Sequence, residues 1–117
     1  MATVTDQEFR ARMQALCDKF AATVPVTLDK ITRALAACRA DGPDGPDAAH
    51  LHELHELLHG VAGTAGTFGY GTLGQYCRNV EQQMRAVLAG QAEWPAVADQ
   101  VDALLRWAAR DPRAPSW

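Results

Sequence analysis

Apolar residues recur three and four positions apart along most of this chain, the spacing that places them on one face of an α-helix. No segment alternates apolar and polar residues for long, and β-branched residues are sparse, so no strand is expected. The breaks in the pattern predict five helices. The first is expected to begin after a T-x-x-E capping box at Thr5, and the second carries Pro25 in its first turn. The third is expected to run from about Asp47 to Thr67, the fourth to follow a turn at residues 68–71, and the fifth to follow a break at 89–93 with Pro95 in its first turn.

Each predicted helix carries one apolar stripe, which is core by default in a helical bundle. The connections are short, and the Gly- and Pro-rich segment 41–47 is the most distinct loop. These features predict an all-α fold, an antiparallel four-helix bundle with an additional N-terminal helix. One domain is expected over 1–117, with a disordered or frayed tail over about 110–117. The five stripes are Phe9, Met13, Leu16, Cys17 and Phe20; Leu28, Ile31, Leu35 and Cys38; Leu51, Leu54, Leu58, Val61 and Ala65; Leu73, Tyr76, Cys77, Val80, Met84, Val87 and Leu88; and Trp94, Val97, Val101, Leu104, Leu105 and Ala108.

Composition narrows the class of protein. A length of 117 residues suits one domain, and a hydrophobic fraction of 48% argues against disorder. The formal net charge of −3 argues against nucleic acid or an anionic membrane as the main partner. Neither a membrane-spanning helix nor a signal peptide is expected, because the apolar stretches are short and interrupted by charges. Cys17, Cys38 and Cys77 are too widely spaced for a disulfide or zinc pattern, so they are expected to be reduced, buried and structural in a cytoplasmic protein.

The third predicted helix carries three histidines on one face. His52, His55 and His59 are spaced i, i+3 and i+7, and their face lies about 100° from the middle of the leucine stripe. His59 should therefore sit beside the core with its ring open to solvent. His52 and His55 are expected to be ordinary solvated or rim side chains.

Small residues continue along the face of His59. Ala62, Gly63 and Gly66 share it, and Gly60 lies just to one side. Each glycine inside a helix costs on the order of 1 kcal/mol relative to alanine. Either another helix packs closely here, or a partner protein reaches the His59 ring over a surface without side chains. The second explanation also accounts for a run that begins at a histidine. A helical interaction module without chemistry is a further alternative, but it leaves the glycines unexplained.

The segment from His55 to His59 also spells H-E-x-x-H, the zinc-peptidase signature. Two histidines at i and i+4 can bind zinc with Glu56 as general base, and Glu81 could be a third ligand. The signal is weak, since a short motif arises by chance in a helix rich in His and Glu. A peptidase also needs a substrate cleft, usually with an edge strand, and no strand is expected. A zinc metallopeptidase that uses His55, Glu56 and His59 is therefore kept only as an alternative.

The segment H-G-V-A-G-T-A-G-T-F-G, from His59 to Gly69, resembles the motif of the histidine-containing phosphotransfer (HPt) domain family. That motif reads roughly H-x-[LIV]-[KA]-G-[SA]-A-G-x-[FLV]-G. Further on, a second segment is similar to the family's L-x-x-x-[CA]-x-x-[LIV]-[EQ] pattern on the next helix. The residues that carry this second resemblance are Leu73, Cys77, Val80 and Glu81.

The resemblance implies a four-helix bundle with one phosphorylatable histidine, which relays phosphoryl groups between receiver domains or from a kinase to a receiver. By motif position that histidine is His59. Glu81 matches the family's Glu or Gln near the active ring, and hairpin geometry agrees: a turn centred near Gly69 and Tyr70 places residues about ten before it opposite residues about eleven after it. Glu81 could then accept a hydrogen bond from one ring nitrogen of His59 and present the other nitrogen outward.

Such a protein is a phosphotransfer intermediate, and no autonomous catalytic activity is expected of it. The sequence offers no P-loop and no acidic pocket for Mg²⁺, so no intrinsic cofactor or metal is expected, and a partner would supply the aspartate and the Mg²⁺. The expected partner is a response-regulator receiver domain, a hybrid sensor histidine kinase or both, and a monomer suffices. At Ala62 many members carry a lysine that would help to neutralise phosphoryl charge. The expected docking surface comprises Glu56, Gly60, Ala62, Gly63, Gly66, Arg78 and Gln82.

Overall fold

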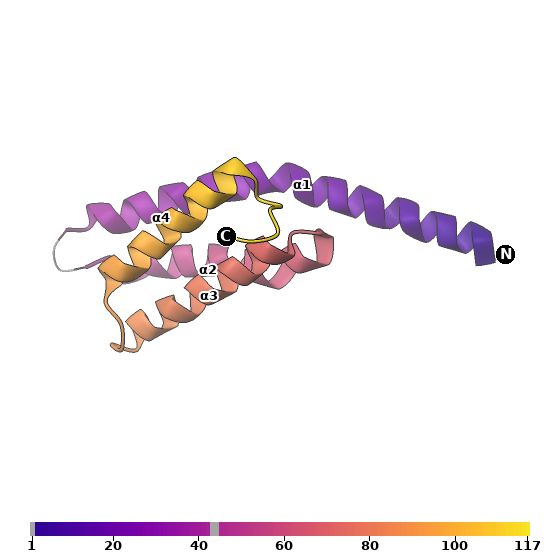
Figure 1. Ribbon diagram of the computed structural model, residues 1–117. Helices are drawn as coiled ribbons and strands as arrows, with labels where there is room; N and C mark the ends of the chain where they lie inside the picture. Colours follow the sequence, from indigo (N-terminus) through magenta and orange to yellow (C-terminus); the bar gives the residue numbers. More distant parts are fainter. Residues whose placement is uncertain (1, 43–44) are drawn as a thin grey trace.

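A computed structural model describes residues 2–42 and 45–117 of the chain, with side chains from residue 5 onward, and its regular elements are all helical in these ranges. Four α-helices and one short 3-10 helix follow one another (Figure 1). The prediction of an all-α fold is confirmed for the described residues. The elements are α1 (Ala2–Ala40), α2 (Ala48–Thr64), η1 (Ala65–Phe68), α3 (Gly71–Leu88) and α4 (Trp94–Arg110).

The predicted four-helix bundle is present, and the C-terminal half of α1 provides its first helix (Figure 1). α2 packs against both α1 and α3, while α4 packs against α1 and α3 from the other side. Short connections make neighbouring helices run antiparallel. None of the described helices is long and apolar enough to cross a membrane. The largest side chains that are completely buried in the core are Ile31, Leu54, Leu58, Leu73, Met84 and Leu104.

The predicted break at Pro25 is wrong, since α1 continues through it as a single helix. Proline cannot donate to the carbonyl four residues earlier, which normally costs a helix about 3 kcal/mol. Here Pro25 is exposed, and apolar side chains on both sides of it, including Val24 and Ile31, enter the same core. Burial of these flanking residues therefore holds the two stretches on one axis. Thr5 consequently lies inside a helix that begins at Ala2, so the predicted capping box does not mark its start.

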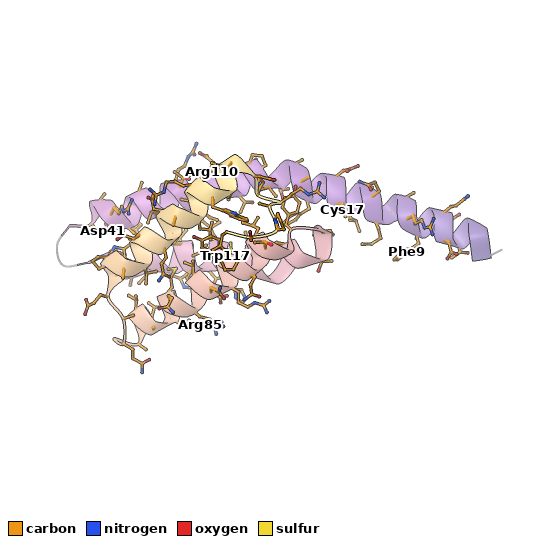
Figure 2. All side chains as sticks on the ribbon, in the orientation of Figure 1. Phe9, Cys17, Asp41, Arg85, Arg110 and Trp117 are labelled. Carbon is orange, nitrogen blue, oxygen red and sulfur yellow. The ribbon has the colours of Figure 1, made fainter. Side chains whose placement is uncertain are left out.

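The first apolar stripe is the second correction, because much of it lies outside the core. The N-terminal half of α1 extends past the bundle, where Figure 2 labels Phe9 and Cys17. Phe9 and Leu16 are 63% and 47% exposed. Only at Phe20, which packs against the core, does this stripe meet the other helices. The stripe has core composition, but no neighbouring helix in the described chain is long enough to cover it.

Hydrogen bonds of one histidine and two aspartates stabilise the connection between α1 and α2. Of the predicted loop 41–47, residues 43–44 lie outside the described residues. The Asp41 carboxylate accepts hydrogen bonds from the Asp47 backbone N–H (2.7 Å) and from His50 Nδ1 (2.8 Å). Asp47 in turn caps α2 by accepting from the Ala49 backbone N–H at 2.7 Å. The predicted start of this helix near Asp47 is therefore confirmed.

The turn between α2 and α3 lies where the sequence predicts it. After α2 the chain tightens into η1, and Gly69 adopts a left-handed conformation with φ of +91°, which glycine accepts without strain. Tyr70 N–H then donates to the carbonyl of Ala65 at 2.9 Å. The ring of Phe20 covers the turn, 5.1 Å from the ring of Phe68 and 5.3 Å from that of Tyr70 between centroids. The hairpin is thus fixed to α1 close to the point where α1 leaves the bundle.

A close approach of α3 to the end of α2 depends on a glycine that sequence analysis did not single out. A Cβ added at Gly74 would lie 3.3 Å from the Cβ of Ala65 and 3.4 Å from the backbone nitrogen of Gly66. Gly74 therefore lets α3 pack closely against η1, where a larger side chain would have to displace its neighbours by a few tenths of an ångström.

The C-terminal tail, expected to fray, lies against α3 and α4. Trp107 Nε1 donates to the carbonyl oxygen of Ser116 at 2.9 Å. The ring of Trp117 lies 4.6 Å from that of Tyr76, and Figure 2 labels it over the bundle. These contacts connect the last residues to α3 and α4.

Candidate functional site

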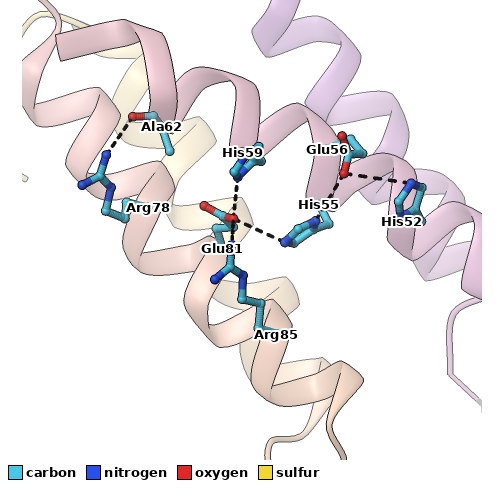
Figure 3. Close-up of polar contacts among 8 residues, drawn as sticks. All are labelled: His52, His55, Glu56, His59, Ala62, Arg78, Glu81 and Arg85. Atoms are coloured by element: carbon cyan, nitrogen blue, oxygen red, sulfur yellow. Dashed lines mark hydrogen bonds and ion pairs between the residues drawn. The ribbon is translucent and has the colours of Figure 1, made fainter.

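His59 and Glu81 face each other across the hairpin, as the register of the turn predicts. His59 lies on α2 with 58% of its side chain exposed, while Glu81 lies on α3 with 6% exposed. His59 Nδ1 is 2.7 Å from Glu81 Oε1 (Figure 3). This is a short, charge-assisted hydrogen bond between an open imidazole and a carboxylate at the edge of the core.

Arg85 completes the polar environment of Glu81. One turn further along α3, its Nη2 donates to the same carboxylate oxygen at 2.9 Å. Burial acts to raise the pKa of Glu81, but the hydrogen bond with His59 and the charges of His59 and Arg85 outweigh it and hold that pKa below its ordinary value. Glu81 is therefore an anion at neutral pH, which makes it an acceptor only.

This arrangement selects one form of the His59 ring. Because an ionised carboxylate only accepts, Nδ1 of His59 must carry the proton that it shares with Glu81. In the neutral ring the other nitrogen, Nε2, then holds a free electron pair. The carboxylate can also stabilise positive charge on the ring when Nε2 forms a new bond. The geometry thus suits a nucleophile that attacks from Nε2.

The backbone around His59 is open. A Cβ added at Gly60, Gly63 or Gly66 would meet nothing within 4 Å. Close packing by another helix therefore does not explain these three glycines. A hollow of about 240 Å³ lies beside the imidazole between α2 and α3. It is lined by His59, Ala62, Gly63, Arg78, Glu81, Gln82 and Arg85.

The residues expected to dock a partner fall into different places around the ring. Gly63, Arg78 and Gln82 line the hollow together with His59. Ala62 lines it too, but only 9% of the residue is exposed, so it forms the floor of the hollow and little open surface. Its carbonyl oxygen accepts from Arg78 Nη2 at 3.3 Å, which holds the guanidinium over the hollow (Figure 3).

The remaining expected docking residues lie elsewhere. Glu56 and Gly60 border a separate groove of about 370 Å³ between α1 and α2, whose lining is mainly apolar. Gly66 is exposed in η1. His59 therefore stands on a ridge between a polar hollow and an apolar groove.

The other two histidines of the face differ from each other. The side chain of His52 is 73% exposed, in keeping with a solvated residue. That of His55 is only 14% exposed, and its Nε2 is buried 3.5 Å from Glu81 Oε1 without a hydrogen-bond partner. His55 thus lies at the rim of the core, but its contact with Glu81 was not predicted, although its i, i+4 spacing from His59 was a signal that both rings could reach one residue of α3.

The zinc-peptidase alternative gains no support from this geometry. His55 and His59 both direct a ring nitrogen toward Glu81, while Glu56 is 57% exposed and lies on the other side of His55 (Figure 3). Across residues 2–42 and 45–117, no group of three or more His, Cys, Asp or Glu side chains is placed to hold a metal ion.

Two of the three cysteines are buried, as predicted, and Cys17 is half-buried. Burial raises the pKa of Cys77, one helical turn before Glu81, to about 12, and the charge of Glu81 adds to the effect. Burial likewise raises the pKa of Cys38 to about 11. Neither thiol ionises near neutral pH, so neither competes with His59 as a nucleophile.

These features define a helical bundle that presents one open imidazole against a buried carboxylate, with bare backbone beside it. Among known protein families, the Hpt domain matches residues 15–108. The match covers most of the chain, so this protein belongs to the Hpt domain family, whose members act in histidine phosphotransfer within phosphorelays. No curated protein matches the chain, and no solved structure does.

Proposed function

We propose that His59 is the phosphoryl-accepting residue of a phosphorelay, which takes a phosphoryl group from a receiver aspartate or a sensor kinase and passes it to a response-regulator receiver. The observation that carries the proposal is the 2.7 Å contact between His59 Nδ1 and Glu81 Oε1, combined with a side chain that is 58% exposed. That pair fixes the ring while leaving Nε2 accessible. The open glycines beside it support access by a second protein.

The proposed transfer is a displacement at phosphorus. The electron pair of His59 Nε2 attacks the phosphorus of an aspartyl phosphate, an N–P bond forms, and the P–O bond to the aspartate breaks. The aspartate leaves as a carboxylate with the bonding electrons, and the imidazole ring becomes positively charged. Glu81 offsets that charge through Nδ1–H. Transfer onward to another receiver is the reverse displacement, in which its aspartate attacks the phosphorus.

Catalytic metal chemistry belongs to the partner in this proposal. A receiver domain supplies the aspartate and the Mg²⁺, and this chain supplies the nucleophile and a docking surface. The hollow beside His59 gives the phosphoryl oxygens a place near the Arg78 and Arg85 side chains that line it. In this proposal the two arginines supply the charge neutralisation for which the family motif suggests a lysine at the position of Ala62. We further propose that the protein acts as a cytoplasmic monomer.

Phosphoryl transfer to variants of the two paired histidines tests the proposal. A phosphorylated receiver, or a hybrid sensor kinase with ATP, should transfer acid-labile, base-stable phosphate to the wild type and none to His59→Gln. His50→Gln is the matched control, because His50 also lies on α2 and also contacts a carboxylate through Nδ1. It should accept phosphate at the rate of the wild type.

Three outcomes would count against the proposal. Label that persists in His59→Gln would move the acceptor elsewhere. A receiver that binds the wild type but never transfers phosphate would favour the interaction module without chemistry. Stoichiometric zinc lost on changing His55 or His59, together with peptide hydrolysis, would favour the metallopeptidase.

A further inference from the structure

Glu81 Oε1 receives more than the two hydrogen bonds that hold it. His59 Nδ1 and Arg85 Nη2 approach it at 2.7 and 2.9 Å, and His55 Nε2 approaches the same oxygen at 3.5 Å (Figure 3). Three nitrogen atoms therefore surround one carboxylate oxygen. Two of them come from successive turns of α2, and the third comes from the turn of α3 that follows Glu81.

His55 is unusual because its buried nitrogen has no hydrogen-bond partner. A buried polar atom without a partner costs roughly 1–3 kcal/mol, so a chain gains nothing in stability from such an arrangement. At 3.5 Å the contact with Glu81 is too long for a good hydrogen bond. It is still a close electrostatic contact at the edge of the core, where charges are poorly screened by water.

The His55 ring also faces the ring of His59. The two ring planes differ by 16°, and their centroids lie 6.1 Å apart. One imidazole thus stands one helical turn below the other in nearly the same orientation. Both turn a nitrogen to the same carboxylate, which links the position of Glu81 to both rings.

We propose that His55 is a positioning residue for His59, a role that rests on the proposed phosphotransfer function. With its proton on Nε2, His55 attracts Glu81 Oε1 from the turn of α2 that precedes His59 and keeps the carboxylate beneath the His59 ring. Arg85 is 62% exposed and would otherwise draw Glu81 toward solvent. His55 therefore maintains the Nδ1–H form of His59, in which Nε2 is free to attack.

Substitution of His55 separates this role from simple packing. His55→Leu keeps an apolar volume and removes the N–H, while His55→Gln retains an N–H at the end of a side chain of similar reach. His52→Leu is the matched control, since His52 is 73% exposed and its contact is with Glu56. Nitrogen-15 NMR of the imidazole rings measures the fraction of His59 in the Nδ1–H form without any phosphate present.

We expect His55→Leu to lower the Nδ1–H fraction of His59 and to slow phosphoryl transfer roughly tenfold, by analogy with residues that orient metal-bound histidines. His55→Gln should restore both quantities to within about twofold of the wild type, and His52→Leu should change neither. If circular dichroism shows that His55→Leu is unfolded, His55→Asn replaces it, because its amide is too short to reach Glu81.

The inference would be overturned if His55→Leu, or His55→Asn in its place, left the Nδ1–H fraction of His59 unchanged. It would also be overturned if His55→Gln restored neither that fraction nor the transfer rate. Failure of the proposed function looks different. In that case the wild type takes no phosphate, while the NMR comparison still decides whether His55 positions the His59 ring.

Discussion

Helix α2 carries two histidine–carboxylate pairs with nearly the same local chemistry and very different surroundings. His50 Nδ1 lies 2.8 Å from Asp41 Oδ2, and His59 Nδ1 lies 2.7 Å from Glu81 Oε1. In the atoms that make contact and in the distance between them, the two pairs are equivalent. The first joins the loop to α2 near its start, and the second joins α2 to α3.

The two pairs differ in what surrounds them. Asp41 also accepts from the Asp47 backbone, so the first pair closes the loop onto α2. Glu81 is 6% exposed beneath a ring that is 58% exposed, and the backbone beside that ring is open. A histidine–carboxylate hydrogen bond alone therefore does not identify a functional histidine. Burial of the acid and bare backbone around the ring separate a presented imidazole from a structural contact.

Removal of the two acids should give the largest contrast between the pairs. Glu81→Leu takes away the acceptor that fixes Nδ1–H on His59 and the charge that offsets the phosphorylated ring. We expect the rate of phosphoryl transfer to fall by about tenfold to a hundredfold, with Glu81→Gln intermediate because its amide oxygen can still accept. The measurement is the rate of phosphate labelling from a phosphorylated receiver in excess.

Asp41→Asn is the control for that experiment, and it should leave the transfer rate unchanged. Equal transfer rates for Glu81→Leu and the wild type would show that the Glu81 carboxylate does not contribute to phosphoryl transfer. The His59–Glu81 pair would then be no more functional than the His50–Asp41 pair. Circular dichroism establishes that each variant is folded before rates are compared.

Much of this architecture follows from the sequence because its signals are long or fixed by spacing. The stripe Leu51, Leu54 and Leu58 extends over several turns, and the turn at Gly69 sets the register that brings His59 to Glu81. A helix boundary predicted from a single residue was less reliable. Pro25 marks a helix start by itself, yet packing of Val24 and Ile31 into one core overrules it.

Features that depend on the approach of two helices could not be predicted from either helix alone. The partial burial of His55 and the burial of Ala62 depend on how closely α3 packs against α2, and Gly74 allows α3 to pack closely against the η1 turn that follows α2. On a helical wheel, Ala62 shares the open face of His59. Likewise, the stripe at Phe9 has the composition of a core stripe, and only the lengths of the neighbouring helices leave it exposed.

A side chain placed on the bare backbone beside His59 should weaken docking of a receiver domain. Gly63→Leu adds a side chain to open space beside His59, so the protein should fold normally. A receiver that approaches the ring should then bind about tenfold more weakly, equivalent to about 1.4 kcal/mol of lost binding free energy. Isothermal titration calorimetry with the receiver measures the change.

Two further variants are controls for the binding measurement on Gly63→Leu. Gly63→Ala should stabilise α2 by up to about 1 kcal/mol with little effect on binding, because alanine is the better helix former. Ala109→Leu adds the same bulk to an exposed position on α4 and should bind normally. Normal binding by Gly63→Leu would mean that the partner does not use this surface.

The smallest expected effect concerns the pH dependence of the His50–Asp41 pair. The side-chain hydrogen bond with Asp41 raises the pKa of His50, and the hydrogen bond with His50 lowers the pKa of Asp41. A histidine with a raised pKa contributes stability below its unfolded pKa of about 6.5 and loses it as the pH rises through the folded value. An aspartate with a lowered pKa contributes stability above about 3.9 and loses it as the pH falls.

The pair should therefore stabilise the fold most between about pH 4 and 6.5, where both groups are charged. Urea unfolding of the wild type and His50→Gln should differ most near pH 5, and the difference should shrink by pH 8. Phosphoryl transfer by His50→Gln should match that of the wild type at both pH values, because this pair closes a loop and His59 carries the chemistry. A loss of transfer in His50→Gln without a loss of stability would make the first pair functional as well, and the distinction drawn from burial and bare backbone would fail.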